Sequence, residues 1–269
     1  MNRDMGMMLA LLREKAPLVH IITNSVSAHL VASAVLATGA LPIMARDSAE
    51  VEEVVEKADA LVLNTGTPSK ERLQSMLLAG RAAMRAGVPV VLDPVGVGFS
   101  EFRSRCVHEL LSAIQVDVLR GNVSEVAAVA QMGGVPRGVH VSEQILDGRD
   151  VASSAAIRLG SIVAVTGEVD YVSDSTRIAA ISGGHGLISR VSGAGCASSA
   201  LIGAFLGVNT DDKLGACVSA LSLSKSAAAR AVARSSGAGS LMTRWIDELQ
   251  MMEPEALAGS TAVEWGDVS

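Results

Sequence analysis

The sequence predicts an α/β fold in which helices flank a mostly parallel, doubly wound sheet. Short apolar runs alternate with longer segments of helical periodicity from the start of the chain to about residue 250. Most of these runs are almost wholly apolar, as strands buried on both faces should be. Because no linker or repeat interrupts the pattern, we predict a single domain over residues 1–252 and a poorly anchored tail over residues 253–269.

The predicted parallel strands are short and rich in apolar residues, and they are Leu18–Ile22, Leu41–Ala45, Ala60–Asn64, Val88–Asp93, Val116–Arg120 and Ser161–Thr166. Helix signals lie between them. Asp47 is expected to cap one helix, Pro68 to occupy the first position of the next, and Gly87 to end it. Alternation of strand and helix implies right-handed crossovers between parallel strands.

The pattern changes after the last parallel strand. Two strand-like runs, Tyr171–Asp174 and Arg177–Ile181, have only two residues between them, which predicts a β-hairpin. Glycine-rich residues 182–186 lead on to Ser192–Cys196, and three helices follow, ending near Met252.

Composition limits the classes of partner. The chain has 269 residues, of which 49% are hydrophobic, so a large core can form and disorder is excluded as the main state. The net charge of −6 and the aromatic content of 2% argue against a nucleic-acid surface. We therefore expect a small-molecule partner.

Neither a membrane segment nor a disulfide framework is predicted. Val191–Thr210 is uncharged, but its first half is too polar and glycine-rich to lie in lipid. The cysteines, Cys106, Cys196 and Cys217, have no zinc-like spacing, and they suit a reducing compartment. We expect a cytoplasmic protein.

The loops after the predicted strands are polar and glycine-rich, and they include residues 23–25, 44–46, 64–67, 93–98, 120–125 and 166–168. In open α/β sheets, ligands bind outside the carboxyl ends of the strands. The sequence therefore places a small-molecule site at this edge.

A phosphate site is predicted at Ser192–Cys196. Small residues before a helix leave free N–H groups, here those of Gly193, Ala194 and Gly195, open to an anion. An ordinary glycine-rich turn into a buried helix is the alternative. No Walker A, GxGxxG or GxSxG motif occurs, which disfavours P-loop kinases, dinucleotide enzymes and α/β-hydrolases.

Charged residues at the same edge suit a phosphate and its metal. Asp93 and Glu125 both follow strands, and two carboxylates beside a phosphate site are suited to a hydrated Mg²⁺. Each could instead be a helix cap or a surface acid. Arg120 is predicted to neutralise phosphate charge, the alternative being a surface salt bridge.

Several short motifs occur in a fixed order along residues 16–250. They are Pro17–His20 with Ile22–Asn24, Thr38–Ala40 with Pro42–Ala45, Asp93–Gly98, Arg120–Asn122 with Ser124–Glu125, Thr166–Asp170, and Gly193–Cys196. Together they resemble those of the hydroxyethylthiazole kinase family, the thiamine-salvage member of the ribokinase-like group.

The resemblance implies a ribokinase-like fold and ATP-dependent phosphorylation of the hydroxyl of 5-(2-hydroxyethyl)-4-methylthiazole. It also implies a Mg²⁺ requirement and a homotrimer with active sites between subunits. Another ribokinase-like kinase, acting on a hydroxymethylpyrimidine or a sugar, stays open. So does a non-catalytic paralogue that binds nucleotide or thiazole.

The resemblance also implies roles for individual residues around the nucleotide. Arg120 and Thr166 would contact ATP, while Asn122 and Glu125 would organise Mg²⁺ and phosphate, with Asp93 assisting the metal. Ala238 and Leu241 lie in a segment that usually reads GPGSF, a departure that bears on the nucleotide pocket.

On the acceptor side, Met44 and Gly193 would line the thiazole pocket, with Asn24 and Val26 close by. Cys196 stands where related kinases usually carry the Asp that takes the hydroxyl proton, so it is the candidate catalytic residue. A thiol is the poorer base at pH 7, but phosphoryl transfer depends mainly on positioning and charge neutralisation. The alternative for Cys196 is a small buried apolar residue.

Overall fold

The computed structural model describes residues 2–132 and 147–268, and within them the strands form one continuous sheet. They are β1 (Leu18–Ile22), β2 (Leu41–Ile43), β3 (Ala60–Asn64), β4 (Val90–Asp93), β5 (Val118–Asn122), β6 (Ile162–Thr166), β7 (Asp170–Ser173), β8 (Arg177–Ser182) and β9 (Ala262–Asp267). Their order across the sheet is β2-β1-β3-β4-β5-β6-β7-β8-β9. Strands β1 to β6 pair in parallel, whereas β7, β8 and β9 extend the sheet with antiparallel pairs.

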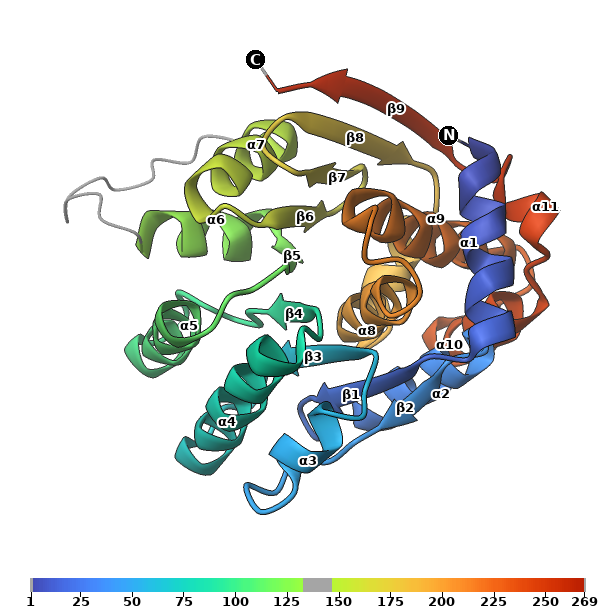
Figure 1. Cartoon of the computed structure of the whole chain (residues 1–269). Coiled ribbons are helices and arrows are strands. Elements are labelled where there is room, and N and C mark those ends of the chain that lie inside the picture. Colours follow the sequence, from blue (N-terminus) through green and yellow to red (C-terminus); the bar gives the residue numbers. More distant parts are fainter. Residues whose placement is uncertain (1, 133–146, 269) are drawn as a thin grey trace.

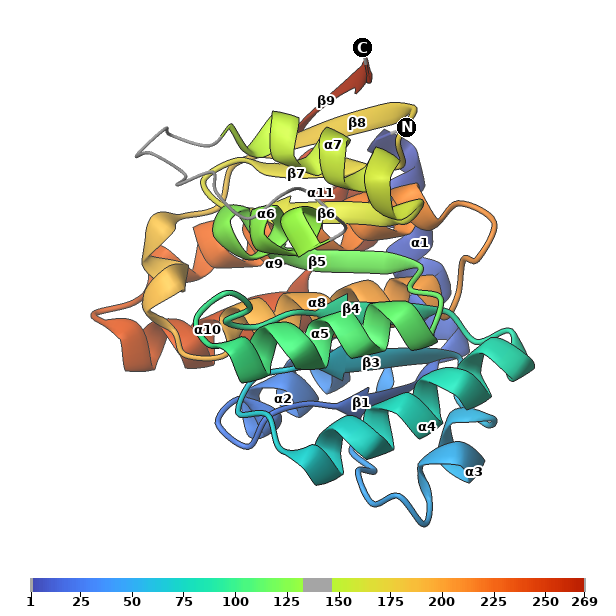
Figure 2. The same cartoon turned by 90° about the vertical axis from the view of Figure 1, so that its left-hand side faces the viewer.

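Helices cover both faces of this sheet. They are α1 (Asn2–Lys15), α2 (Ala28–Thr38), α3 (Val51–Val55), α4 (Lys70–Ala86), α5 (Glu101–Ala113), α6 (Val123–Met132), α7 (Gly148–Leu159), the 3-10 helix η1 (Gly186–Arg190), α8 (Ala194–Leu206), α9 (Lys213–Val232), α10 (Ala238–Met251) and α11 (Pro254–Leu257). Helices α4 to α7 pack on one face and α8 to α10 on the other, as Figures 1 and 2 show from two directions. This arrangement confirms the predicted α/β class with a doubly wound, mostly parallel sheet.

Each face of the sheet has its own buried core. On β1, Ile21 belongs to the cluster under α8 to α10, whereas its neighbour Ile22 belongs to the cluster under α4 to α7. Burial on both faces explains the nearly continuous apolar strands. Helix α8 lies so close to the sheet that a Cβ at Gly203 would be 2.5 Å from Val62 Cγ2.

The prediction of a poorly anchored tail is wrong for the described residues. Leu257 of α11 is fully buried, and β9 pairs with β8 along its whole length, from Ala262 opposite Ser182 to Asp267 opposite Arg177. Strand β9 is an edge strand in which Val263 and Trp265 alternate with small or polar residues. Such a strand has a weak sequence signal because its partner provides most of the order.

Two predicted helix starts also differ from the structure. Helix α3 begins at Val51, and Asp47 instead accepts a hydrogen bond from Ala49 N in the preceding turn, at 2.9 Å. Helix α4 begins after Pro68, with Ser69 Oγ accepting from Arg72 N at 3.2 Å. The predicted hairpin is confirmed as β7 and β8.

Gly87 ends α4 in the left-handed conformation with φ 71°, as predicted. Across residues 2–132 and 147–268, no helix is long and apolar enough to cross a membrane.

Candidate active site

Asp93 lies at the centre of the predicted site, at the carboxyl end of β4. Its Oδ2 accepts hydrogen bonds from Asn64 Nδ2 at 2.7 Å and from Ser199 Oγ at 2.9 Å. Its Oδ1 is buried and has no hydrogen-bond partner within the described part of the chain. Burial raises the pKa of Asp93 to about 6, against the attraction of Arg120. A carboxylate this poorly solvated can accept a cation or a proton at its free oxygen.

Two amide side chains connect β1 and β3 to Asp93. Asn24 Nδ2 donates to Asn64 Oδ1 at 2.9 Å, and Asn64 in turn donates to Asp93. Asn24 Oδ1 accepts from the N–H groups of Val26 and Ser27, both at 3.0 Å. The two amides are therefore held in one orientation by their own hydrogen bonds.

Cys196 lies in the first turn of α8, beside this amide chain. Asn24 Nδ2 is 3.6 Å from its Sγ. Burial, followed by the negative charge of Asp93, raises the pKa of the Cys196 thiol, while the side chains of Ser27 and Asn64 oppose the shift. The thiol is therefore predominantly neutral at pH 7.

The start of α8 has the geometry predicted for Ser192–Cys196, with one refinement. Gly193 has a left-handed backbone with φ 88°, and a Cβ there would be 2.9 Å from Ser27 Cβ. Ala194 N already donates to Val191 O at 3.2 Å. Of the amides predicted to bind an anion, the one of Ala194 is therefore already engaged within the chain.

Arg120 approaches the site from β5 and is not a surface residue. Its side chain is 11% exposed, with Nη1 4.0 Å from Asp93 Oδ2 and Nη2 donating to Thr166 Oγ1 at 2.5 Å. A Cβ at Gly195 would be 2.9 Å from Arg120 Nη1, so the guanidinium lies directly against the N-terminus of α8. The interpretation as a surface salt bridge is wrong.

Glu125 and Asn122 form a reciprocal cap at the start of α6. Glu125 N donates to Asn122 Oδ1 at 2.9 Å, and Asn122 N donates to Glu125 Oε2 at 3.0 Å. Glu125 Oε1 accepts from Gly96 N at 2.8 Å, which ties the loop after β4 to this helix. Both carboxylate oxygens are therefore engaged with backbone, and the helix-cap alternative for Glu125 is correct in addition to any role with a metal.

The predicted thiazole side is less tightly connected. Val26 is 69% exposed, and Met44, which follows β2, packs partly against the core. His20 Nε2 donates to Ala45 O at 2.9 Å and so holds the segment after β2. Burial lowers the pKa of His20, which keeps the imidazole neutral.

Two residues that contact Asp93 were not predicted. Asn64 ends a buried strand at the ligand-binding edge, and this position alone was a usable signal. Ser199 lies on α8 three residues after Cys196, on the same helix face. A lone serine in a buried helix has no sequence feature that distinguishes it from a packing residue.

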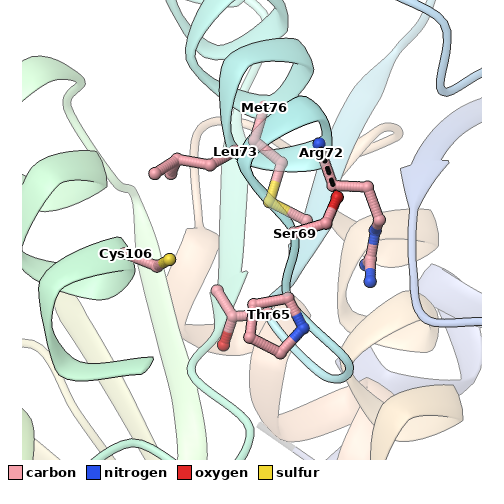
Figure 3. Close-up of a pocket in the computed structure, with 7 residues that line it drawn as sticks. Thr65, Ser69, Arg72, Leu73, Met76 and Cys106 are labelled. Atoms are coloured by element: carbon pink, nitrogen blue, oxygen red, sulfur yellow. Dashed lines mark hydrogen bonds between the residues drawn. The ribbon is translucent and has the colours of Figure 1, made fainter. Parts of the chain in front are cut away.

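A pocket lies near this edge, under the start of α4, and it is lined by Thr65, Pro68, Ser69, Arg72, Leu73, Met76 and Cys106 (Figure 3). None of the predicted site residues lines it. Arg72 donates to the carbonyls of Asn64, Gly66 and Thr67 at 2.6 to 3.0 Å. This arginine therefore fixes the loop that carries Asn64.

The metal-binding capacity of the site is limited. Among the described residues there is no group of three or more His, Cys, Asp or Glu side chains that would enclose a metal ion. Mg²⁺ usually retains several waters and takes only one or two protein carboxylates. The free Oδ1 of Asp93 fits a hydrated ion of this kind and does not fit a closed metal site.

Comparison with known proteins gives a consistent result over nearly the whole chain. The model of the hydroxyethylthiazole kinase family matches residues 9–255. A hydroxyethylthiazole kinase of Granulibacter bethesdensis is 44% identical, covering 93% of this chain and 90% of its own length. One of Moorella thermoacetica is 41% identical, covering 91% of each.

Solved structures agree with the sequence relatives. The structure of a hydroxyethylthiazole kinase from Pyrococcus horikoshii OT3 matches with a TM-score of 0.90 and 38% identity, over 98% of this chain and 99% of that one. The pyridoxal kinase from Staphylococcus aureus in complex with AMP-PCP and pyridoxal matches with a TM-score of 0.62 at 14% identity. A ribokinase-like superfamily protein from Enterococcus faecalis gives 0.66 at 12% identity, and these two likenesses concern the fold alone.

Proposed function

We propose, from the premise that this chain belongs to the hydroxyethylthiazole kinase family, that its carboxyl edge binds ATP and a thiazole alcohol on opposite sides of Asp93. The reaction is transfer of the terminal phosphoryl group of ATP to the hydroxyl of hydroxyethylthiazole. The observation that carries the assignment to this edge is the convergence of Asp93, Arg120 and Cys196 on the N-terminus of α8.

The ATP side is assigned to Arg120 and Thr166. The guanidinium is nearly buried and held by Thr166 Oγ1, so it is fixed in place before a phosphate arrives. The amides of Gly195 and Cys196 add the positive end of the α8 dipole. Phosphoryl transfer depends mainly on such positioning and charge neutralisation, and this set provides both.

The metal side is assigned to Asp93 and Glu125. Asp93, whose Oδ1 has no partner among the described residues, and Glu125, whose oxygens accept backbone N–H groups, are the residues that would hold Mg²⁺. When bound, Mg²⁺ neutralises phosphate charge. Asn122 would keep Glu125 and the start of α6 in position.

The alcohol side is assigned to Asn24, Val26, Met44 and Gly193, with Cys196 accepting the hydroxyl proton. Because burial and Asp93 raise the pKa of Cys196, little of it is thiolate at neutral pH, and the neutral thiol is a poor proton acceptor. We therefore expect it to contribute less to the rate than Arg120 or Asp93 does. The neutral amides of Asn24 and Asn64 suit a neutral heterocyclic alcohol.

We also propose the homotrimer with sites between subunits. Val26, Leu36 and Leu41 are exposed apolar side chains on neighbouring elements at the β2 edge, which a second copy could cover. The expected cytoplasmic location stays a prediction.

A substrate panel tests the proposal. Purified protein with labelled ATP and Mg²⁺ is given hydroxyethylthiazole, a hydroxymethylpyrimidine and a sugar in parallel. We expect labelled phosphate on the thiazole alcohol alone, and the Asp93→Asn variant as a control should lose that signal. Transfer to the sugar or pyrimidine without transfer to the thiazole would contradict the proposal, and so would the absence of ADP formation with any of them.

A further inference from the structure

Two lysines of helix α9 form ion pairs with aspartates of the sheet. One pair lies at the amino ends of the parallel strands and the other at their carboxyl ends. Near the start of α9, Lys213 Nζ is 2.5 Å from Asp117 Oδ1, just before β5. Twelve residues later, Lys225 Nζ is 3.3 Å from Asp170 Oδ1, at the start of β7. Because β7 runs antiparallel to β6, Asp170 lies at the carboxyl edge, where the site is.

Lys225 is more than one half of an ion pair. Its ammonium donates to Glu168 O at 2.8 Å, to Gly167 O at 3.2 Å and to Gly183 O at 3.4 Å. With Asp170 this makes four acceptors for three N–H groups, so the ammonium is fully used. The side chains of Lys225 and Asp170 are only 10% and 6% exposed.

These contacts fasten two turns that come from different strands. The first turn follows β6 and contains Gly167 and Glu168, and the second follows β8 and contains Gly183 and Gly184. Gly184 has φ +78°, and a Cβ there would be 3.1 Å from Lys225 Cγ. The lysine therefore packs against one turn and hydrogen-bonds both.

Asp170 also fixes the backbone next to Thr166, which is the hydrogen-bond partner of Arg120. Asp170 Oδ1 accepts from Gly167 N at 2.9 Å, which fixes the residue next to Thr166. Thr166 Oγ1 accepts from Arg120 Nη2. Gly167 and Glu168 are exposed at the surface, yet their backbone is held from beneath by a buried pair. The two turns, Gly167–Glu168 and Gly183–Gly184, therefore have a backbone that is fixed by this pair and lies beside Arg120. We call these two turns the ledge.

We propose that Lys225 and Asp170 are positioning residues for ATP, and that they hold the turns after β6 and β8 as a ledge on which the nucleotide binds. The inference rests on the proposed assignment of Arg120 and Thr166 to ATP. A buried ion pair is a costly way to stabilise a fold, since apolar residues of similar volume often stabilise as well or better. Stabilising the fold therefore does not by itself account for the Lys225–Asp170 pair, whereas fixing the two turns for an anionic ligand does.

The matched control is the other pair on the same helix. Lys225→Met and Lys213→Met remove the same group from α9, and Asp117, like Asp170, also accepts a backbone N–H, that of Val90 at 2.8 Å. Both variants should lower the melting temperature. Only Lys225→Met should raise KM for ATP, by about tenfold, because misplacing a binding group by a fraction of an ångström is costly. KM for the thiazole alcohol should stay within about twofold in both variants.

Asp170→Asn provides a second, milder variant if Lys225→Met does not fold. It keeps an acceptor for Gly167 N and removes the charge, so a smaller rise in KM for ATP is expected. Calorimetric binding of a non-hydrolysable ATP analogue checks the same change without catalysis. The analogue should bind less tightly to Lys225→Met and normally to Lys213→Met.

The outcomes separate the inference from the proposed function. If Thr166→Val raises KM for ATP while Lys225→Met behaves like Lys213→Met, the ledge is wrong and the nucleotide assignment stands. If neither Thr166→Val nor Arg120→Lys changes KM for ATP, the nucleotide assignment itself is wrong, and the ledge fails with it.

Discussion

The two sides of Asp93 are built from different chemistry. Toward β1 and β3 the contacts come from neutral amides, Asn24 and Asn64, which hydrogen-bond each other and the backbone. Toward β5 the neighbour of Asp93 is the charged side chain of Arg120, whose Nη1 lies 4.0 Å from Asp93 Oδ2. A neutral alcohol needs orientation without charge, whereas a nucleotide polyphosphate needs fixed cations. The contrast supports the proposed assignment of the alcohol to the neutral side and of ATP to the charged side.

The difference also has an energetic side. Paired amides that satisfy each other are buried at little net cost, whereas buried ions carry a desolvation penalty that their partners only partly offset. Asp93 takes part in both networks and has one unused oxygen. It is the position where stability and activity should oppose each other most strongly.

The largest effect is expected from Asp93→Asn, which removes the negative charge of the residue that lies between the two sides. The amide can still accept from Asn64 and Ser199, so the fold should persist. Loss of the charge should lower kcat by about 100-fold or more. Steady-state kinetics at saturating Mg²⁺ measures this, and a variant with nearly normal turnover would remove Asp93 from the reaction.

The same substitution should stabilise the protein. The folded pKa of Asp93 is about 6 and its ordinary value is 3.8, so the folded state binds a proton between these values that the unfolded state does not. The contribution of Asp93 to stability therefore falls as pH rises from about 4 to about 6, by up to about 3 kcal/mol. Urea unfolding in EDTA should show this slope in the wild type and lose it in Asp93→Asn.

Arg120→Lys tests the charged side. Lysine keeps the charge, but it cannot reach Thr166 Oγ1 and face Asp93 at the same time as the planar guanidinium does. We expect KM for ATP to rise about ten- to thirtyfold, the effect of one lost charged hydrogen bond. KM for the thiazole alcohol serves as the internal control and should not move. An equal rise in both constants would mean that Arg120 supports the whole edge and not the nucleotide side.

Asn24→Ala tests the neutral side with the opposite expectation. It removes the donor to Asn64 and the acceptor for the N–H groups of Val26 and Ser27. KM for the thiazole alcohol should rise about five- to tenfold, with a loss of about 1–2 kcal/mol in the free energy of unfolding. KM for ATP should be unchanged. The division between the two sides would be refuted by an effect on ATP larger than that on the alcohol.

The sequence predicted the parallel sheet because buried strands have a strong local signal. It also placed Asp93, Arg120 and Thr166 at one edge, since each follows or ends such a strand. It missed β9, whose order comes from β8, and Ser199, which looks like any small residue in a buried helix. The hydrogen bond that joins Glu125 of α6 to the loop after β4 could not be seen in the sequence either, because Gly96 N lies 29 residues away in the chain.

The smallest effect is expected at Cys196, whose Sγ lies 3.6 Å from Asn24 Nδ2 on the neutral side. Its raised pKa makes thiolate scarce, so Cys196→Ala should lower kcat only about threefold, because Arg120 and the helix amides still act on the phosphoryl group. Cys196→Asp should match or exceed the wild type, since a carboxylate is ionised where the thiol is not. Asp93 will raise the pKa of the new carboxyl as well, so the activity of the Asp form should rise with pH until that carboxyl is ionised. Profiles of kcat against pH for the three forms, at saturating Mg²⁺ and equal thermal stability, measure the ranking. If the Asp form is slower than the Ala form at every pH, Cys196 only fills space at the start of α8, and proton transfer needs no side chain there.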